Sequence, residues 1–181
     1  PAAGRVVVLT ADHGEEFFEH GGFEHGHALF HEVIHVPLVI SGLAGAARVV
    51  SEPVGLLDVA PTLLAAAGSA DPGTWGQNLA GPIDAARALR SSNMLRVAPA
   101  RMFSYRRGHW KAIRDAEARD ALFDLQADPG ETHNVASSHP ELLGELLEGG
   151  LGRGIGAGGA AEISDMEMQR LEQLGYLGAG E

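Results

Sequence analysis

Histidine and carboxylate side chains are concentrated near the start of the chain. Six of the nine histidines lie within the first 35 residues, interspersed with acidic residues. The histidines are His13, His20, His25, His27, His31 and His35, and the acidic residues are Asp12, Glu15, Glu16, Glu19, Glu24 and Glu32. Histidine is neither a common loop residue nor a strong core former. This density therefore indicates metal or proton chemistry in the segment.

Asp12 and His13 hold the best position for such chemistry. They follow residues 6–10 (VVVLT), a short apolar, β-branched run that predicts a buried strand. Open α/β sheets build their sites at the carboxyl ends of strands, where a carboxylate and an imidazole could bind a divalent cation. Gly14 would let the backbone turn away. The alternative is that Asp12 caps a following helix and His13 is a surface residue.

The composition narrows the classes of protein that fit. The chain has 181 residues, of which 24 are acidic and 13 are Lys or Arg, giving a formal net charge of −11. Such a chain is a poor candidate for binding nucleic acid or an anionic membrane surface. The absence of cysteine excludes disulfides, thiolate metal ligands and a cysteine nucleophile within these residues. No stretch has the roughly 18 consecutive apolar residues needed to span a bilayer.

The first half of the chain has an α/β pattern. Residues 6–10 and 36–41 predict two buried strands that are neighbours in one sheet. Between them, residues 11–35 form a long polar segment, and segments of this length inside a domain are usually functional. Residues 49–54 predict a short strand. Residues 58–67 (DVAPTLLAAA) predict a helix that Asp58 could cap.

The second half has a different pattern. Short alternating segments separated by turn residues predict an antiparallel meander over residues 100–106, 110–114 and 121–125. A helix is expected over residues 140–147. We therefore divide the chain into an α/β part (1–92), a meander-plus-helix part (93–150), and a Gly-rich linker with a terminal helix (151–181). The linker covers residues 149–159 and the helix residues 164–177.

The order of several motifs is more specific than any one of them. Residues 10–21 read TADHGEEFFEHG, residues 25–32 read HGHALFHE, and residues 36–40 read VPLVI. Further motifs follow at residues 56–64 (LLDVAPTLL), 105–113 (YRRGHWKAI) and 122–134 (LFDLQADPGETHN). This succession resembles the sulfatase family of the alkaline phosphatase superfamily. The resemblance implies the carboxyl-terminal portion of an alkaline-phosphatase-like α/β sheet, with a small antiparallel β subdomain and a packed helix.

The resemblance also assigns roles to three residues. In the family, the positions of Asp12 and His13 bind one divalent cation, usually Ca²⁺ and sometimes Mn²⁺; Mg²⁺ is a further candidate. His25 matches the catalytic and substrate-binding position that contacts the ester near its leaving group. The physics agrees, since charge grows on the bridging oxygen as it leaves, and a cation and a His donor stabilise it. The imidazole ligand makes Mn²⁺ or Zn²⁺ chemically plausible beside Ca²⁺.

Two parts of the family's machinery have no counterpart in these residues. The family's nucleophile is a formylglycine made from Cys or Ser in a C/S-x-P/A-x-R motif, and its other acidic ligands are an Asp pair; both lie upstream. We therefore expect the chain to be inactive without the missing amino-terminal half of the same polypeptide. The expected substrate is a small sulfate ester or a sulfated glycan. A periplasmic or secreted location would follow if the upstream region carries a signal.

Two alternatives remain open. The ester could be a phosphate, phosphonate or phosphodiester, because the same charge logic serves each. The chain could also be a non-catalytic metal-binding module on the same scaffold. Among the other polar residues, we interpret His20 as a loop residue bonded to backbone, Lys111 as a solvated side chain on a half-buried strand, and residues 128–131 (DPGE) as a turn.

Overall fold

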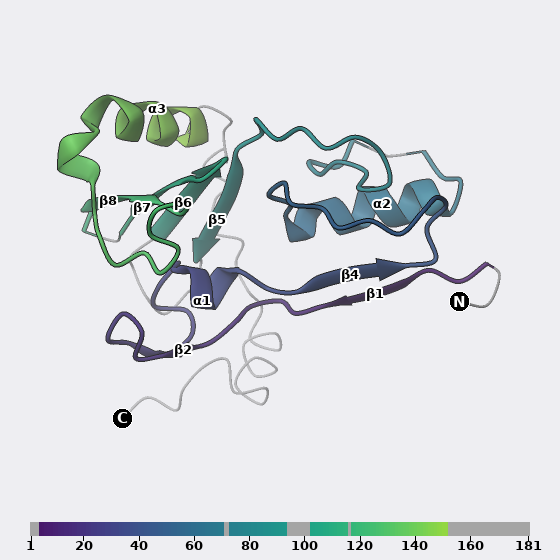
Figure 1. Cartoon of the computed structure of the whole chain (residues 1–181), viewed down its shortest axis with the longest axis horizontal. Helices are drawn as coiled ribbons and strands as arrows, with labels where there is room; N and C mark the ends of the chain where they lie inside the picture. The colour runs from purple at the N-terminus through teal and green to yellow at the C-terminus, as the bar shows by residue number, and fades with distance from the viewer. Residues whose placement is uncertain (1–3, 71–72, 94–101, 116, 152–181) are drawn as a thin grey trace, which may run out of the picture.

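The computed structural model describes residues 4–70, 73–93, 102–115 and 117–151, and Figure 1 shows their arrangement. They form a two-stranded sheet (β1 and β4), a two-stranded hairpin (β2 and β3) and a four-stranded sheet (β5 to β8). Three α-helices accompany these sheets. The predicted terminal helix over residues 164–177 and most of the Gly-rich stretch lie outside the described residues. Within the described ranges, no helix combines the length and apolar character that crossing a bilayer requires.

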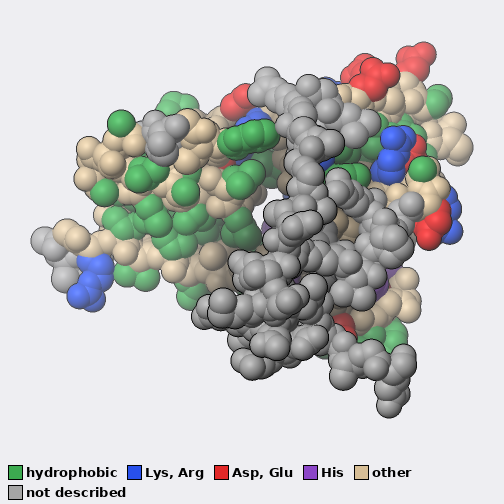
Figure 2. All heavy atoms as spheres, turned by 180° about the vertical axis from the view of Figure 1, so that it is seen from behind, with side chains coloured by type: hydrophobic (Ala, Val, Ile, Leu, Met, Phe, Trp, Pro, Cys, Tyr) green, Lys and Arg blue, Asp and Glu red, His purple; other side chains and the backbone are tan. Residues whose placement is uncertain are grey.

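The first sheet pairs β1 (Val7–Thr10) with β4 (Leu38–Ser41) in antiparallel register. The prediction that these two segments are neighbours is confirmed, but the prediction that they are buried is wrong for the described residues. Val7, Leu9 and Val39 are 49%, 58% and 58% exposed, respectively. Cross-strand pairing puts these side chains on one face, and no described layer covers it. Figure 2 shows hydrophobic side chains, in green, across the part of the molecule that contains this sheet, on the left of the view.

The second large sheet is an antiparallel meander with strand order β5-β6-β7-β8. Its strands are β5 (Leu89–Asn93), β6 (Met102–Arg107), β7 (Trp110–Arg114) and β8 (Asp120–Asp124). The predicted meander is therefore confirmed, with one strand more than the sequence indicated. The predicted boundary after residue 92 falls inside β5, because this strand pairs along its whole length with β6.

One face of this sheet carries the main hydrophobic core. Tyr105, Ala112 and Leu122 lie side by side across β6, β7 and β8 and are at most 1% exposed. They pack against Leu146 and Leu147 of α3 (Pro140–Leu151). Figure 1 shows α3 above this sheet. Helix α3 is the one predicted from residue 140, and it extends four residues beyond the predicted end.

The region between the sheets departs from two predictions. Residues 49–54 do not form a strand. The helix predicted over residues 58–67 is present as α2 (Val59–Ala66), which follows a 3-10 turn, η1 (Leu56–Asp58). The Asp58 side chain does not cap it. The Asp58 carboxylate is fully buried and accepts hydrogen bonds from the Gly55 and Gln77 backbone amides and from Arg87.

Residues 11–35, called the site segment below, are ordered by short elements. The hairpin strands β2 (Glu16–Phe17) and β3 (Phe23–Glu24) are followed by α1 (His31–Ile34). The start of the segment is bonded to its end, since the Gly14 amide donates to Val33 O at 2.7 Å and the Glu15 amide donates to Glu32 O at 3.0 Å. The segment therefore closes on itself between β1 and β4.

Candidate active site

Asp12 and His13 follow β1 directly, as the sequence pattern predicts. The His13 amide donates to Asp12 Oδ1 at 3.0 Å, and His13 Nδ1 donates to Gly14 O at 2.8 Å. This second bond leaves His13 Nε2 free to act as a ligand, 3.9 Å from Asp12 Oδ1. The Asp12 side chain is 79% exposed. The pair thus offers one oxygen and one nitrogen at an accessible position.

His25 lies against His13 although twelve positions separate them in the sequence. The two imidazole rings stack with centroids 3.9 Å apart and an angle of 24° between their planes. His25 Nδ1 donates to Glu15 Oε1 at 3.0 Å, which leaves its Nε2 available to a ligand. The β2–β3 hairpin turns the chain back and produces this contact. The structure thus brings together the three residues singled out from the sequence, while their roles stay predictions.

Glu16 holds the hairpin from inside. Its side chain is 1% exposed, and Oε1 accepts the backbone amides of His20 (3.1 Å) and Gly22 (2.6 Å). His27 Nε2 contacts the other oxygen at 2.9 Å. Burial raises the pKa of Glu16, but the Gly22, His27 and His20 hydrogen bonds lower it more, so the carboxylate is ionised. A Cβ at Gly22 would lie 2.1 Å from His27 Nε2, so a larger residue there would displace the His27 ring.

His20 joins two parts of the molecule. Its Nδ1 lies 2.6 Å from Glu32 Oε1, its Nε2 lies 3.1 Å from Glu131 O, and its ring stacks on Phe30 at 3.7 Å. A carbonyl and a carboxylate are both acceptors, so both ring nitrogens carry protons. Burial lowers the pKa of His20, but the bonds to Glu32 and Glu131 raise it more. The sequence interpretation found the bond to backbone but missed the Glu32 partner.

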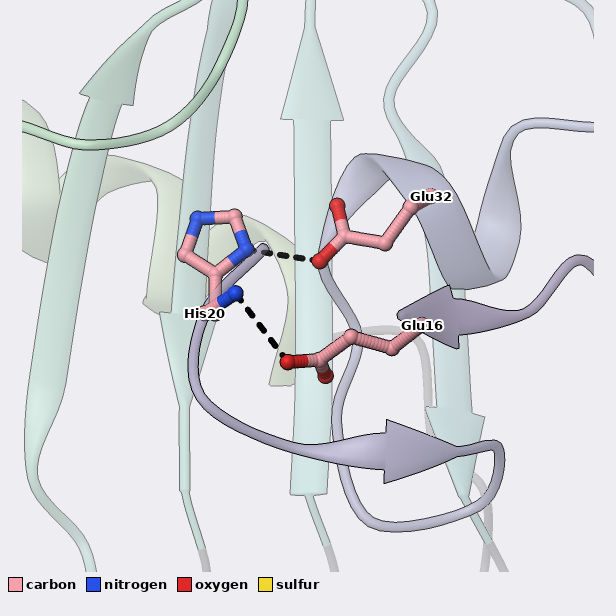
Figure 3. A group of neighbouring side chains, drawn as sticks. All are labelled: Glu16, His20 and Glu32. Atoms are coloured by element: carbon pink, nitrogen blue, oxygen red, sulfur yellow. Dashed lines mark hydrogen bonds and ion pairs between the residues drawn. The ribbon is translucent and has the colours of Figure 1, made fainter. Parts of the chain in front are cut away.

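Glu16, His20 and Glu32 have the donor types of a metal site, and Figure 3 shows how they face one another. Their ligand atoms all lie within 4.8 Å of one another. Each of them already takes part in a short hydrogen bond, however: Glu16 with backbone amides, and His20 with Glu32. An ion would have to displace these bonds. The arrangement fits a charged hydrogen-bond network better than a metal centre.

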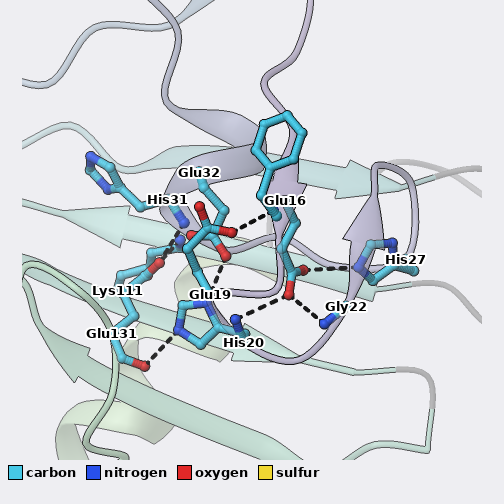
Figure 4. Close-up of polar contacts among 10 residues, drawn as sticks. Glu16, Glu19, His20, Gly22, His27, His31, Glu32, Lys111 and Glu131 are labelled. Atoms are coloured by element: carbon cyan, nitrogen blue, oxygen red, sulfur yellow. Dashed lines mark hydrogen bonds and ion pairs between the residues drawn. The ribbon is translucent and has the colours of Figure 1, made fainter.

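Lys111 and Glu131 complete this network, as Figure 4 shows. Lys111 Nζ lies 2.6 Å from Glu131 Oε1, and Glu131 Oε2 accepts the His31 backbone amide at 2.5 Å. The two residues are only 1% and 2% exposed. The predicted solvated Lys111 is therefore wrong, because the site segment covers this face of β7. Burial lowers the pKa of Lys111, and Glu131 opposes the change.

The remaining histidines of the segment are structural in this arrangement. Burial, His35, Lys111 and Arg106 lower the pKa of His31 to about 4, so its ring is neutral near pH 7. His27 contacts the buried carboxylate of Glu16, as described above. The residues that sequence reasoning missed are Glu15, Glu16, Lys111 and Glu131. The density of carboxylates among the histidines was a usable signal for the first two.

An Asp-His pair at a strand end and an adjoining antiparallel sheet are consistent with the carboxyl-terminal part of an alkaline-phosphatase-like fold, which similar solved structures support. Comparison with known proteins makes this more specific. The profile of the Sulfatase family matches residues 5–69. Arylsulfatase K of Mus musculus is 32% identical over 158 residues, which cover 78% of this chain and 28% of the relative. These matches support a sulfatase family member, of which this chain is a carboxyl-terminal part.

Solved structures agree on the fold. A 2-O GAG sulfatase aligns with a TM-score of 0.72 and 24% identity, over 82% of this chain and 36% of that one. A protein solved in complex with its substrate, D-glucosamine-2-N,6-O-disulfate, aligns with a TM-score of 0.62 and 22% identity, over 82% and 33%. The chain thus spans between a quarter and two fifths of each protein compared here.

Proposed function

We propose that the chain is the carboxyl-terminal part of a metal-dependent sulfuric ester hydrolase. The observation that carries this proposal is the stacking of His25 on His13 beside Asp12, at the end of β1. It joins a metal-ligand pair to a proton donor at one accessible place. The relatedness to arylsulfatase K supports a sulfate ester as the substrate. The reaction is hydrolysis of the ester to an alcohol and sulfate.

Asp12 and His13 would hold one divalent cation. Their donor set fits this group, since a carboxylate oxygen and a free imidazole nitrogen lie 3.9 Å apart on an exposed edge. Two ligands are fewer than such an ion needs, and we expect further carboxylates from upstream residues. The cation, Ca²⁺ or alternatively Mn²⁺ or Mg²⁺, would neutralise charge on the ester oxygens. A formylglycine nucleophile is also expected upstream.

His25 would donate a proton or a hydrogen bond to the bridging oxygen of the ester as charge develops there. Its bond to the Glu15 carboxylate orients the ring and occupies Nδ1, which leaves Nε2 for the ester. Stacking on His13 fixes the plane of the ring. A donor placed in advance in this way needs no reorganisation during the reaction.

The exposed face of the first sheet supports the expectation of a missing amino-terminal half. Val7, Leu9 and Val39 expose apolar surface on one side of a two-stranded sheet, and such a sheet is marginal by itself. We infer that upstream residues of the same polypeptide cover this face and bring the nucleophile to His25. Within that arrangement, a small sulfate ester or a sulfated glycan is the proposed substrate, and a periplasmic or secreted location is the proposed compartment.

The test uses the whole polypeptide that contains these residues and the variant His25→Ala. Removing one such donor typically costs about 10²–10³ in rate. We expect this loss for sulfate esters of alkyl or sugar alcohols, which leave poorly. A much smaller loss is expected for nitrophenyl sulfate, whose leaving group needs no proton. His133→Ala is the matched control, because its side chain is 81% exposed and its contacts to Asp128 and Thr132 lie within its own turn.

Three outcomes distinguish the alternatives. An equal loss for both leaving groups would make His25 a binding residue, and no loss would reject its role. Faster hydrolysis of phosphate or phosphonate esters than of the matching sulfates would assign the alternative substrate class. For the metal, Asp12→Ala should abolish activity, and calorimetry should find only weak Ca²⁺ or Mn²⁺ binding to the 181-residue chain. Submicromolar affinity would contradict the half-site.

A further inference from the structure

Glu131, which follows β8 in the sequence, contacts both the four-stranded sheet and the site segment. Its carboxylate pairs with Lys111 of β7 and accepts the backbone amide of His31, the first residue of α1. Its carbonyl oxygen accepts the ring of His20. One residue therefore contacts the segment at two places, 100 and 111 positions away in the sequence. Figure 4 shows these contacts meeting between the sheet and α1.

The backbone of Glu131 is held in an unfavourable conformation. Its φ is +53°, in the left-handed region that residues with a Cβ avoid. Such strain persists only where the surroundings fix it, and it is found more often at functional sites. In this conformation the carbonyl faces His20 while the carboxylate faces His31.

Folding stability alone does not account for the ion pair between Glu131 and Lys111. A buried ion pair often contributes no more to folding than apolar side chains of similar size would. Apolar side chains, however, could not accept the His31 amide. The position of an acceptor is therefore what the charged pair provides, with Lys111 holding the carboxylate 2.6 Å away.

Other contacts between the sheet and the segment do not involve this pair. The Phe30 and Phe123 rings meet edge to face with centroids 6.1 Å apart, and Asn93 Nδ2 donates to Gly26 O at 2.9 Å. These contacts keep the segment near the sheet when the charges are removed. The two effects, attachment and exact placement, can therefore be separated by mutation.

We propose that Glu131, held in place by Lys111, is a positioning residue that fixes the site segment on the four-stranded sheet, and so sets where Asp12, His13 and His25 lie. The expected effect of Glu131 on catalysis rests on the function proposed above. The effect of Glu131 on the placement of the site segment is independent of that function, because it can be measured without substrate.

The experiment compares two double variants of the whole polypeptide by amide hydrogen exchange. Lys111→Met with Glu131→Leu removes the charges and the acceptor, whereas Lys111→Met with Glu131→Gln removes the charges but keeps a side-chain oxygen. We expect the amides of Gly14, Glu15 and His31 to exchange at least about tenfold faster in the Leu variant. The Gln variant should stay within about threefold of the unmodified protein. Amides of β6 and β7 should keep their protection in both, which shows that the sheet is folded.

The matched control removes an exposed pair with Arg107→Gln and Glu145→Gln, whose side chains are 42% and 65% exposed, and it should change none of these rates. The proposal fails if the Leu and Gln variants behave alike, or if loop and sheet amides accelerate by the same factor. For the catalytic consequence, kcat on a sulfate ester should fall at least about tenfold in the Leu variant and recover in the Gln variant. A protein without hydrolase activity would reject the proposed function, and the exchange result would still decide the placement.

Discussion

Replacing Gly14 with alanine is expected to disturb the site through backbone contact alone. A Cβ at this position would lie 2.0 Å from Glu32 O, whereas a carbon and a carbonyl oxygen normally stay at least about 3.3 Å apart. The backbones must separate by more than about 1 Å. The bond from the Gly14 amide to Val33 O, now 2.7 Å, and the bond from Glu15 to Glu32 O would both be lost.

The size of the effect follows from these two bonds. Each contributes about 0.5–1.5 kcal/mol, so their loss costs about 1–3 kcal/mol. The smaller freedom of alanine in the unfolded chain returns about 0.4–1 kcal/mol. We therefore expect Gly14→Ala to lower the free energy of unfolding by about 1.3 kcal/mol, the middle of a range from about 0 to 2.6 kcal/mol. Urea unfolding followed by tryptophan fluorescence measures this change.

Gly144→Ala is the matched control, because it is the same chemical change in α3, where a Cβ would meet nothing within 4 Å. Alanine is the better helix former by about 0.8–1 kcal/mol, so this variant should be stabilised. Opposite signs are expected for the two variants. If Gly14→Ala were as stable as Gly144→Ala, the close approach of the segment's two ends would not constrain the site.

Two further changes test charged groups. Asp58→Asn removes the carboxylate that Arg87 contacts at 2.7 and 2.5 Å. It should lower the free energy of unfolding, measured in urea, by about 3 kcal/mol. This is the low end of the range for a buried ion pair, because Arg87 is 21% exposed. Burial raises the pKa of Asp58 but its donors lower it more, so this stabilisation is present above pH 3.8 and is lost as pH falls through the folded-state pKa. Glu32→Gln should lower the pKa of His20 in an NMR titration. In the unmodified protein the pKa of His20 is raised above 6.5. The stability contributed by protonated His20 is therefore complete below pH 6.5 and is lost as pH rises through the folded-state pKa. The variant should lose this pH dependence.

The meander was readable because its information is local. Strands β6, β7 and β8 are short segments of mixed apolar and polar residues separated by turn residues, so both the strands and their order follow from short windows. Strand β5 reads LRSSN and has a single apolar residue. Its strand conformation comes from pairing with β6, which no local pattern encodes.

The failed strand over residues 49–54 illustrates the opposite error. Its valines favour a strand, but Val49 is 92% exposed and Pro53 has no amide to donate to a ladder. Nearby, the Arg48 side chain donates to Leu79 O and Gly81 O, so this region is anchored by a side chain instead of a sheet. Propensity without a partner strand was not sufficient.

Burial was harder to predict than pairing. The apolar run of β1 correctly indicated a strand and its neighbour β4, yet the face with Val7 and Leu9 is exposed. A continuous apolar run says that both faces of a strand suit an apolar environment. It does not say which part of the polypeptide supplies that environment. Here it is not among the described residues.

The residues of the candidate site also differ in how far the sequence could predict them. Asp12, His13 and His25 could be selected from a motif within sixteen residues, and their proximity follows from a hairpin inside that stretch. Lys111 and Glu131 could not be connected to them, because the alternation of β7 tells which face Lys111 occupies but not what packs on that face. The covering layer is the site segment itself, about 80–100 residues earlier in the sequence.

The distribution of contacts over the site segment has a consequence for how the site forms. Its two ends continue into β1 and β4, while His20 and His31 within it are bonded to Glu131, which pairs with Lys111 of β7. The hairpin can close locally, because Glu16 and Gly14 bond only within the segment. The His20 ring, by contrast, bonds not only to Glu32 of the segment but also to the carbonyl oxygen of Glu131, which lies outside the segment. Local hydrogen bonds therefore set the shape of the segment, and the buried charges of the second sheet set its place, so a stable β1–β4 pair alone would leave the site residues together but unanchored.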